Sequence, residues 1–185
     1  MKDSLFVRSK VPMTKEEIRT ISLAKLNLKH AKRFLDIGAG TGSISIEACV
    51  EYPELKVTAI ETKDEAVDLI LENKKHFGVE NLEVVKGKAP IDMDDIFDSI
   101  FVGGSGGNLE DILSWSFNHL IPGGSLVLNF ILIENATVAF KWFEDHNIAY
   151  DTVQVQVGNG TKLGVGHYFK PLNPVIIIEA KKEGN

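Results

Sequence analysis

The sequence predicts a single α/β domain, residues 1–185, with a doubly wound, mostly parallel sheet of seven strands, one of them an antiparallel edge strand. Three observations support this fold class. Seven short segments rich in aliphatic and aromatic residues alternate with segments of helical periodicity. The earlier segments are continuous apolar runs, which are typical of parallel strands buried on both faces. No helix separates the last two segments, so one of those strands is expected to run antiparallel.

A short N-terminal arm and a helix are expected before the first strand. Residues 1–13 show no clear periodicity, whereas Thr14 followed by Glu17 has the spacing of a helix cap. Ile18 and Ile21 then continue one apolar helix face to about Leu26. The elements that follow are a strand at 33–37, a helix at 43–52, a strand at 56–60 and a helix at 63–77.

The second half of the chain continues this alternation. Its expected strands lie at 82–85, 99–102, 125–130, 150–157 and 175–179, with helices near 109–120 and 136–143. The glycines between residues 158 and 166 predict a loop that runs to Pro174.

Composition limits the possible functions. Twenty Lys and Arg against 26 Asp and Glu give a net charge of −6, which argues against a broad electrostatic grip on nucleic acid. No apolar run reaches the roughly 20 residues of a membrane helix, and the N-terminus lacks a signal-peptide core, so a cytoplasmic location is expected. Cys49 is the only cysteine, so no internal disulfide can form, and no metal-ligand spacing is present.

The segment Arg33–Gly42, RFLDIGAGTG, predicts a nucleotide-type site. A strand breaks into a turn with glycines at alternate positions, and a helix follows. Glycine lets the backbone turn sharply and approach a ligand, while free N–H groups at the helix start face it. The dinucleotide fingerprint requires a glycine where this chain has Ser43, so a nicotinamide oxidoreductase is disfavoured. The pattern acid-x-Gly-x-Gly-x-Gly instead resembles the cofactor loop of Rossmann-like S-adenosylmethionine methyltransferases.

Two carboxylates near this loop are candidate binding groups. Glu61 ends the second predicted strand, where a carboxylate can accept hydrogen bonds from both ribose hydroxyls of an adenosine cofactor. Asp36 precedes the first glycine, and it either supports the loop structurally or meets the cofactor's amino group. There is no Gly-Lys-Ser/Thr sequence, so nucleotide triphosphate hydrolysis is disfavoured.

The methyl acceptor is expected near the end of the fourth strand. Gly103–Asn108 lacks the Asn/Asp-Pro-Pro-aromatic sequence of methyltransferases that act on amino groups, and its glycines clear space instead. Gly104, Ser105, Asn108 and the later His167 are therefore candidate substrate contacts. No catalytic acid, base or nucleophile triad is identifiable.

Five separated segments resemble one family, the decarboxylating cobalt-precorrin-6B C(15)-methyltransferases (the CbiT family) of cobalamin synthesis. The segments are VPMTKEEIR, FLDIGAGTGSISIEA, FVGGSGGNLEDIL, PGGSLVLNFILIEN and GHYFKPLNPV. The resemblance implies a class I S-adenosyl-L-methionine methyltransferase and homotetramer that methylates a tetrapyrrole at carbon 15 and removes carbon dioxide from the carbon-12 acetate. By position it implies a set of cofactor contacts, namely Thr14, Gly38, Ala39, Gly40, Thr41, Gly42, Glu61 and Ala89.

Two positions depart from the family pattern. Glu61 stands where aspartate is frequent, and Lys88 stands where many methyltransferases place an acid for the adenine, so backbone groups near Ala89 would have to serve there. Because the implied substrate carries many carboxylates, a local basic pocket is expected, with candidates Arg8, Lys10, Arg19, Lys162 and Lys170. The alternatives are a methyltransferase of tRNA or of protein carboxylates, and a non-catalytic module that binds S-adenosylmethionine.

Overall fold

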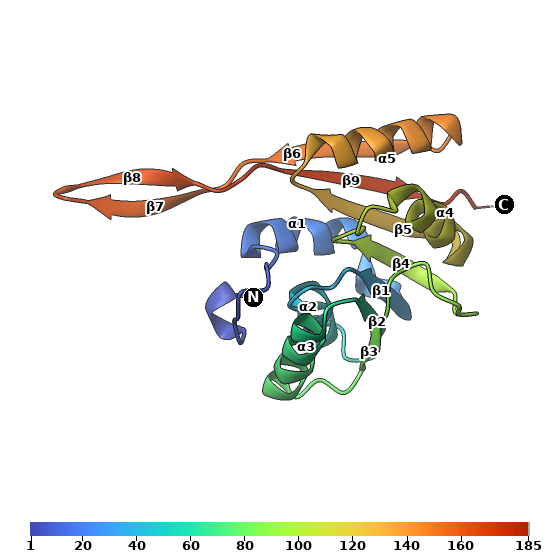
Figure 1. Ribbon diagram of the computed structural model, residues 1–185, viewed down its shortest axis with the longest axis horizontal. Coiled ribbons are helices and arrows are strands. Elements are labelled where there is room, and N and C mark those ends of the chain that lie inside the picture. The colour runs from blue at the N-terminus through green and yellow to red at the C-terminus, as the bar shows by residue number, and fades with distance from the viewer. Residues whose placement is uncertain (185) are drawn as a thin grey trace.

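A seven-stranded sheet forms the centre of the structure, a computed structural model that describes residues 1–184 (Figure 1). The strand order is β3-β2-β1-β4-β5-β9-β6. The strands span Arg33–Ile37 (β1), Lys56–Glu61 (β2), Leu82–Lys86 (β3), Phe97–Val102 (β4), Leu120–Phe130 (β5), Tyr150–Val155 (β6) and Val175–Lys181 (β9). The first five strands pair in parallel, whereas β9 is antiparallel to both of its neighbours.

Helices cover both faces of the sheet. They are α1 (Glu16–Leu26), α2 (Ser43–Glu51), α3 (Asp64–Phe77), α4 (Leu109–His119) and α5 (Ile133–Asp145), and short 3-10 turns occupy Asp3–Leu5 and Leu28–His30. Within residues 1–184, none of these helices combines the length and the apolar composition that crossing a bilayer requires.

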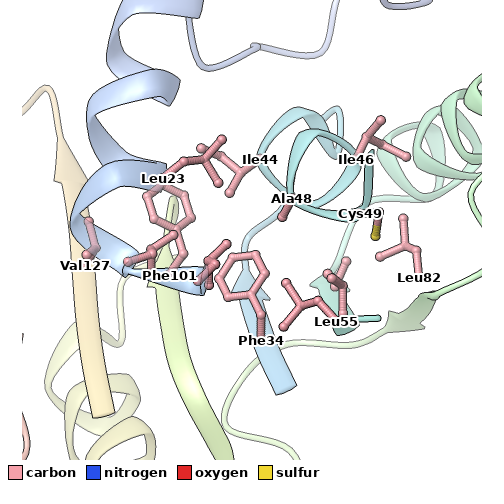
Figure 2. Close-up of a cluster of buried hydrophobic side chains, with 14 of the residues drawn as sticks. Leu23, Phe34, Ile44, Ile46, Ala48, Cys49, Leu55, Leu82, Phe101 and Val127 are labelled. Atoms are coloured by element: carbon pink, nitrogen blue, oxygen red, sulfur yellow. The ribbon is translucent and has the colours of Figure 1, made fainter. Parts of the chain in front are cut away.

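Alternate residues of the strands face two separate apolar cores. Phe34 of β1 packs with residues of α1 and α2, including Leu23 and Ile44 (Figure 2). Its neighbour Leu35 points to the other face and belongs to the cluster that α4 and α5 cover. Burial on both faces explains why the parallel strands read as continuous apolar runs.

All seven expected strands are present, and the predicted fold class is confirmed. The expected edge position of the antiparallel strand is wrong, because that strand is β9 and it lies between β5 and β6. Strand β6 occupies the edge and runs in the same direction as the first five strands. Strand β5 begins at Leu120 and runs through the turn expected at Pro122. The predicted cap at Thr14 is wrong, because α1 begins at Glu16 after Lys15 and has no side-chain capping bond.

The loop predicted for residues 158–174 is also wrong in large part. Strands β7 (Gly158–Leu163) and β8 (Gly166–Pro171) form an antiparallel hairpin that projects away from the body of the protein (Figure 1). Leu163 pairs with Gly166 around a two-residue turn in which Gly164 has a φ of +59°. Glycine supplies this conformation without strain, and the many glycines of the segment hide the strand pattern between them.

Candidate functional site

A cavity of about 600 Å³ opens beside the carboxyl ends of the parallel strands. Its volume suits a small-molecule site, and its position is the usual one for ligands of open α/β sheets. The wall combines the N-terminal arm, the strand-end loops and the root of the hairpin. Its lining segments are 11–15, 37–40, 60–63, 87–89, 103–106 and 129–131, with Val157, Leu172 and Asn173 from the root.

The glycine loop after β1 forms one side of this cavity. Gly38, Gly40 and Gly42 all have positive φ angles, of +69°, +57° and +73°. The backbone N–H of Gly38 donates to the carbonyl of Ile60 at 2.9 Å, which ties the loop to the end of β2. Gly38, Ala39 and Gly40 line the cavity. Thr41 and Gly42 are buried behind them at the start of α2 and are not among its lining residues.

Glu61 is the carboxylate of the cavity. Its Oε1 accepts hydrogen bonds from the backbone N–H groups of Thr62 and Lys63, at 2.8 and 3.0 Å, and from the Thr62 hydroxyl. Its Oε2 accepts one from Gly40 N–H at 2.9 Å. Burial acts to raise the pKa of Glu61, but the backbone hydrogen bonds from Lys63, Gly40 and Thr62 outweigh it and lower the pKa. The carboxylate is thus held ionised, and Oε2 keeps acceptor capacity for a ligand hydroxyl.

Asp36 lies behind the glycine loop. It is fully buried, does not line the cavity, and accepts a 2.5 Å hydrogen bond from the Ser45 hydroxyl at Oδ2. Its Oδ1 has no hydrogen-bond partner within residues 1–184. Burial raises the pKa of Asp36 to about 7, with a smaller contribution from the charge of Glu61, while the Ser45 bond opposes the shift. Of the two roles considered for Asp36, this placement favours structural support of the loop over contact with the cofactor's amino group.

The N-terminal arm supplies a wall of the cavity that contains Thr14. Residues 11–14 line the cavity, and the Pro12 carbonyl lies 3.2 Å from the position of a Cβ on Gly40. Arg19 holds this arm from α1, since its Nη1 donates to the Thr14 carbonyl at 2.6 Å and its Nε donates to Glu47 of α2 at 2.5 Å. Arg19 is therefore wrong as a candidate for the basic pocket, because its guanidinium is fully buried and its donors are used within the protein.

The loops after β3 and β4 meet on the opposite side of the cavity. The side-chain amide of Asn108 donates to the Ala89 carbonyl at 2.8 Å, which joins the two loops. Ala89, Gly104 and Ser105 line the cavity, whereas Asn108 does not. Asn108 therefore fixes the neighbouring backbone instead of facing the cavity. Lys88, which sequence reasoning treated only as a departure from the family, also lines it.

Three further predicted residues lie outside the cavity. His167, Lys162 and Lys170 belong to the hairpin, where all three are exposed. The expectation that they gather at the site is not met, because the segment extends as a hairpin instead of folding back as a loop. Arg8 and Lys10 are exposed on the N-terminal arm and do not line the cavity either.

Sequence reasoning also missed several lining residues. Thr62 and Lys63, which follow β2, both border the cavity. Their positions just after parallel strands are the signal that could have found them. Val157 and Leu172 at the hairpin root carried no such signal, because nothing local indicates that the root returns to the cavity.

Comparison with known proteins identifies the family. Residues 5–182 match the model of the precorrin methyltransferase domain. The chain is 46% identical to the cobalt-precorrin-6B C(15)-methyltransferase (decarboxylating) of Salmonella typhimurium, over the whole of this chain and 97% of that protein. The chain belongs to the precorrin methyltransferase family.

Solved structures of related proteins extend the match to three dimensions. The precorrin-6y C5,15-methyltransferase of Geobacter metallireducens is 35% identical, with a TM-score of 0.91 over 98% of this chain and 96% of that one. The precorrin 8W decarboxylase of Methanobacterium thermoautotrophicum is 27% identical, with a TM-score of 0.89 over 97% and 98% of the two chains. The resemblance drawn from the sequence segments is thereby confirmed, and membership of the precorrin methyltransferase family implies use of a methyl donor.

Proposed function

We propose that this protein methylates cobalt-precorrin-6B at carbon 15 with S-adenosyl-L-methionine and decarboxylates its carbon-12 acetate, as a step in cobalamin biosynthesis in the cytoplasm. The observation that carries the proposal is the end-to-end similarity to the Salmonella typhimurium enzyme of that name. The cavity at the strand ends supports it, because every segment that lines it lies within the matched residues 5–182.

The residues around the cavity suit S-adenosyl-L-methionine. The ionised Glu61 carboxylate at the end of β2 can accept hydrogen bonds from the ribose hydroxyls. At the glycines of the loop the backbone carries no Cβ, so the rest of the cofactor can approach it closely. Thr14, Gly38, Ala39, Gly40, Glu61 and Ala89 would hold it at the cavity surface. Thr41 and Gly42 would act from behind, by shaping the loop and the start of α2.

The chemistry needs little acid–base help from the protein. The sulfonium of the cofactor supplies an electrophilic methyl group, and the conjugated macrocycle can absorb the electrons that remain when carbon dioxide leaves. The task of the chain is to orient the acceptor carbon toward the donor and to exclude water. Residues 103–106 leave room for the acceptor, because they line the cavity and nothing within residues 1–184 lies within 4 Å of a Cβ added at Gly104.

Mass spectrometry of the reaction tests the proposal. The purified protein is incubated with cobalt-precorrin-6B and S-adenosyl-L-methionine, with a control that lacks the methyl donor. We expect the product to gain one methyl group and lose one carbon dioxide. Cofactor binding by calorimetry together with an unchanged tetrapyrrole mass would reject the proposal and favour the non-catalytic module. Turnover of tRNA or of a protein carboxylate instead would favour the other alternative.

We also propose a homotetramer that assembles through the β7–β8 hairpin. Leu163, Val165 and Phe169 are 68%, 107% and 77% exposed on it. A lone two-stranded hairpin is marginally stable, and its open edges and apolar side chains favour pairing with further copies. Light scattering should give the mass of four chains for the wild type. A Leu163→Ser/Val165→Ser/Phe169→Ser variant should have a smaller mass and retain cofactor binding; a tetramer unaffected by it would exclude the hairpin as the contact.

A further inference from the structure

We infer that Lys88 is the cation that binds a side-chain carboxylate of the acceptor, and that this carboxylate is one the product retains. The inference rests on the proposed function for the nature of the acceptor. Its geometric basis is independent of that function, because it concerns an exposed, charged side chain at the wall of a largely apolar cavity.

The position of Lys88 follows from two neighbouring loops. Its stem crosses from the loop after β3 to the glycine segment after β4, where Cε lies 3.4 Å and Nζ 4.0 Å from the place of a Cβ on Gly106. The absence of a side chain at Gly106 leaves the space that the lysine stem uses. The bond from Asn108 to the Ala89 carbonyl holds the two loops together beside it. The ammonium group is therefore carried toward the segment where the acceptor is expected.

The charges around the cavity leave Lys88 available for an anion. Within residues 1–184, no carboxylate lies within ion-pair distance of its Nζ. Two other lysines line the cavity. Lys15 is paired with Asp3 at 3.4 Å, whereas Lys63 is exposed and follows β2 beside Glu61, on the cofactor side of the cavity. Glu61 is already held by the backbone N–H groups of its own loop and of Gly40. Although the chain carries a net charge of −6, the cavity therefore presents an unpaired ammonium group.

The chemistry of decarboxylation indicates which carboxylate Lys88 binds. Loss of carbon dioxide moves the negative charge from the carboxylate into the macrocycle. A cation on the departing carboxylate would stabilise the ground state more than the transition state, and it would slow that step. A cation on a retained carboxylate stabilises both states equally, so that it strengthens binding without changing the chemical step. Lys88 is therefore a substrate-binding residue, and its removal acts on affinity.

Equilibrium binding and steady-state kinetics test this role separately. Cobalt-precorrin-6B is titrated into wild type, Lys88→Gln and Lys88→Arg, each saturated with S-adenosylhomocysteine, which cannot donate a methyl group. Lys86→Gln serves as the matched control, because Lys86 lies two residues earlier, pairs with Asp64 and does not line the cavity. We expect Lys88→Gln to raise the Kd about tenfold, as for loss of one charge-assisted hydrogen bond. The Kd of Lys88→Arg should stay within about threefold of the wild-type value, and the Kd of Lys86→Gln should equal the wild-type value.

The remaining measurements separate the possible outcomes. In turnover assays Lys88→Gln should raise KM with little change in kcat. The difference in KM between Lys88→Gln and wild type should become smaller as salt is added, because salt screens the charge of Lys88. Three results would each overturn the inference. They are an unchanged tetrapyrrole Kd in Lys88→Gln, an equal loss of tetrapyrrole affinity in Lys86→Gln, and a fall in the kcat of Lys88→Gln at constant KM. A wild type that binds the tetrapyrrole but does not turn it over would refute the proposed function alone, because the Kd comparison would still decide the role of Lys88.

Discussion

Gly38 and Gly104 face each other so closely that a Cβ on Gly38 would lie 2.7 Å from the Gly104 carbonyl oxygen. Gly38 follows β1, and Gly104 lies just after β4, the parallel neighbour of β1. The contact closes the floor of the cavity with backbone atoms alone, and both residues line that cavity. A side chain at Gly38 would have to separate the two loops.

Gly38→Ala is expected to destabilise the protein and weaken cofactor binding. The positive φ of +69° costs an L-residue about 1–2 kcal/mol, and the collision with Gly104 adds to it. We expect a total loss of about 3 kcal/mol in the free energy of unfolding, measured by urea denaturation. Gly107→Ala is the matched control, because Gly107 has a φ of +89° but nothing within 4 Å of its Cβ position. Equal losses in the two variants would show that the close approach carries no cost.

Glu61→Gln should weaken S-adenosyl-L-methionine binding by about 10–100-fold, the value of losing one or two hydrogen bonds to a charged acceptor. The amide keeps one oxygen but replaces the other with a donor, which would face the N–H groups of Gly40 or Lys63. Isothermal titration calorimetry measures the change. Glu61→Asp keeps the charge and should lose less, whereas Glu83→Gln on the exposed side of β3 should lose nothing. Wild-type affinity in Glu61→Gln would exclude the carboxylate from the cofactor site.

Arg19→Leu should destabilise the protein by about 3 kcal/mol, because it removes a fully buried partner of Glu47. It also releases the Thr14 carbonyl, so we expect a weaker cofactor Kd in addition to lower stability. Chemical denaturation and calorimetry give the two quantities. The double variant Arg19→Leu/Glu47→Leu should recover part of the stability, since the buried Glu47 carboxylate is then removed together with its guanidinium partner, while the more exposed Met1 ammonium and Asp3 carboxylate can be solvated. Recovery of stability without recovery of cofactor binding would separate the role of Arg19 at the arm from its role in the core.

The stability of Asp36→Asn relative to wild type should increase with pH. The pKa of Asp36 is about 7 in the folded protein and near 3.9 when unfolded, so between these values the folded state binds more protons. Wild-type stability therefore falls as pH rises through this window, by up to about 1.4 kcal/mol per pH unit, and levels off above the folded pKa. The Asn side chain stays neutral, so it contributes no such change of stability with pH.

Urea denaturation at pH 5, 6, 7 and 8 checks this dependence. Ser45→Ala provides a second variant, because it removes the hydrogen bond that opposes the raised pKa. In Ser45→Ala the pKa of Asp36 should be raised further, so the stability of this variant should keep falling to a higher pH than that of wild type. Parallel pH profiles for wild type and Asp36→Asn would mean that Asp36 is ionised throughout.

The sequence patterns predicted the parts of the structure that depend on local order. Strands β1, β2, β4 and the later part of β5 are largely apolar because both of their faces are buried, so their continuous apolar runs located them. The glycine loop and Glu61 were found because ligand sites follow the ends of parallel strands. These features need no knowledge of distant contacts.

The remaining features depend on contacts between distant residues. The buried position of Arg19 depends on Glu47, 28 residues later, and a sequence pattern cannot distinguish it from a surface arginine. Lys88 is directed by the space at Gly106, which belongs to another loop. His167 and its neighbouring lysines were misplaced because a glycine-rich hairpin and a glycine-rich loop share the same composition.

The hairpin joins the body at a narrow seam, where Leu172 N–H donates to the Val157 carbonyl at 2.9 Å and the Gln156 amide donates to Leu172 at 2.6 Å. Residues 158–171, beyond this seam, do not line the cavity, so we expect that they can be removed or exchanged without changing its wall. Replacing residues 158–171 with a tight turn between Val157 and Leu172 would give a shorter chain that keeps β6, β9 and the cavity wall. Alternatively, the hairpin of a relative could replace the same residues. Under the proposed hairpin assembly, subunit number and active-site geometry could then be varied independently in one scaffold.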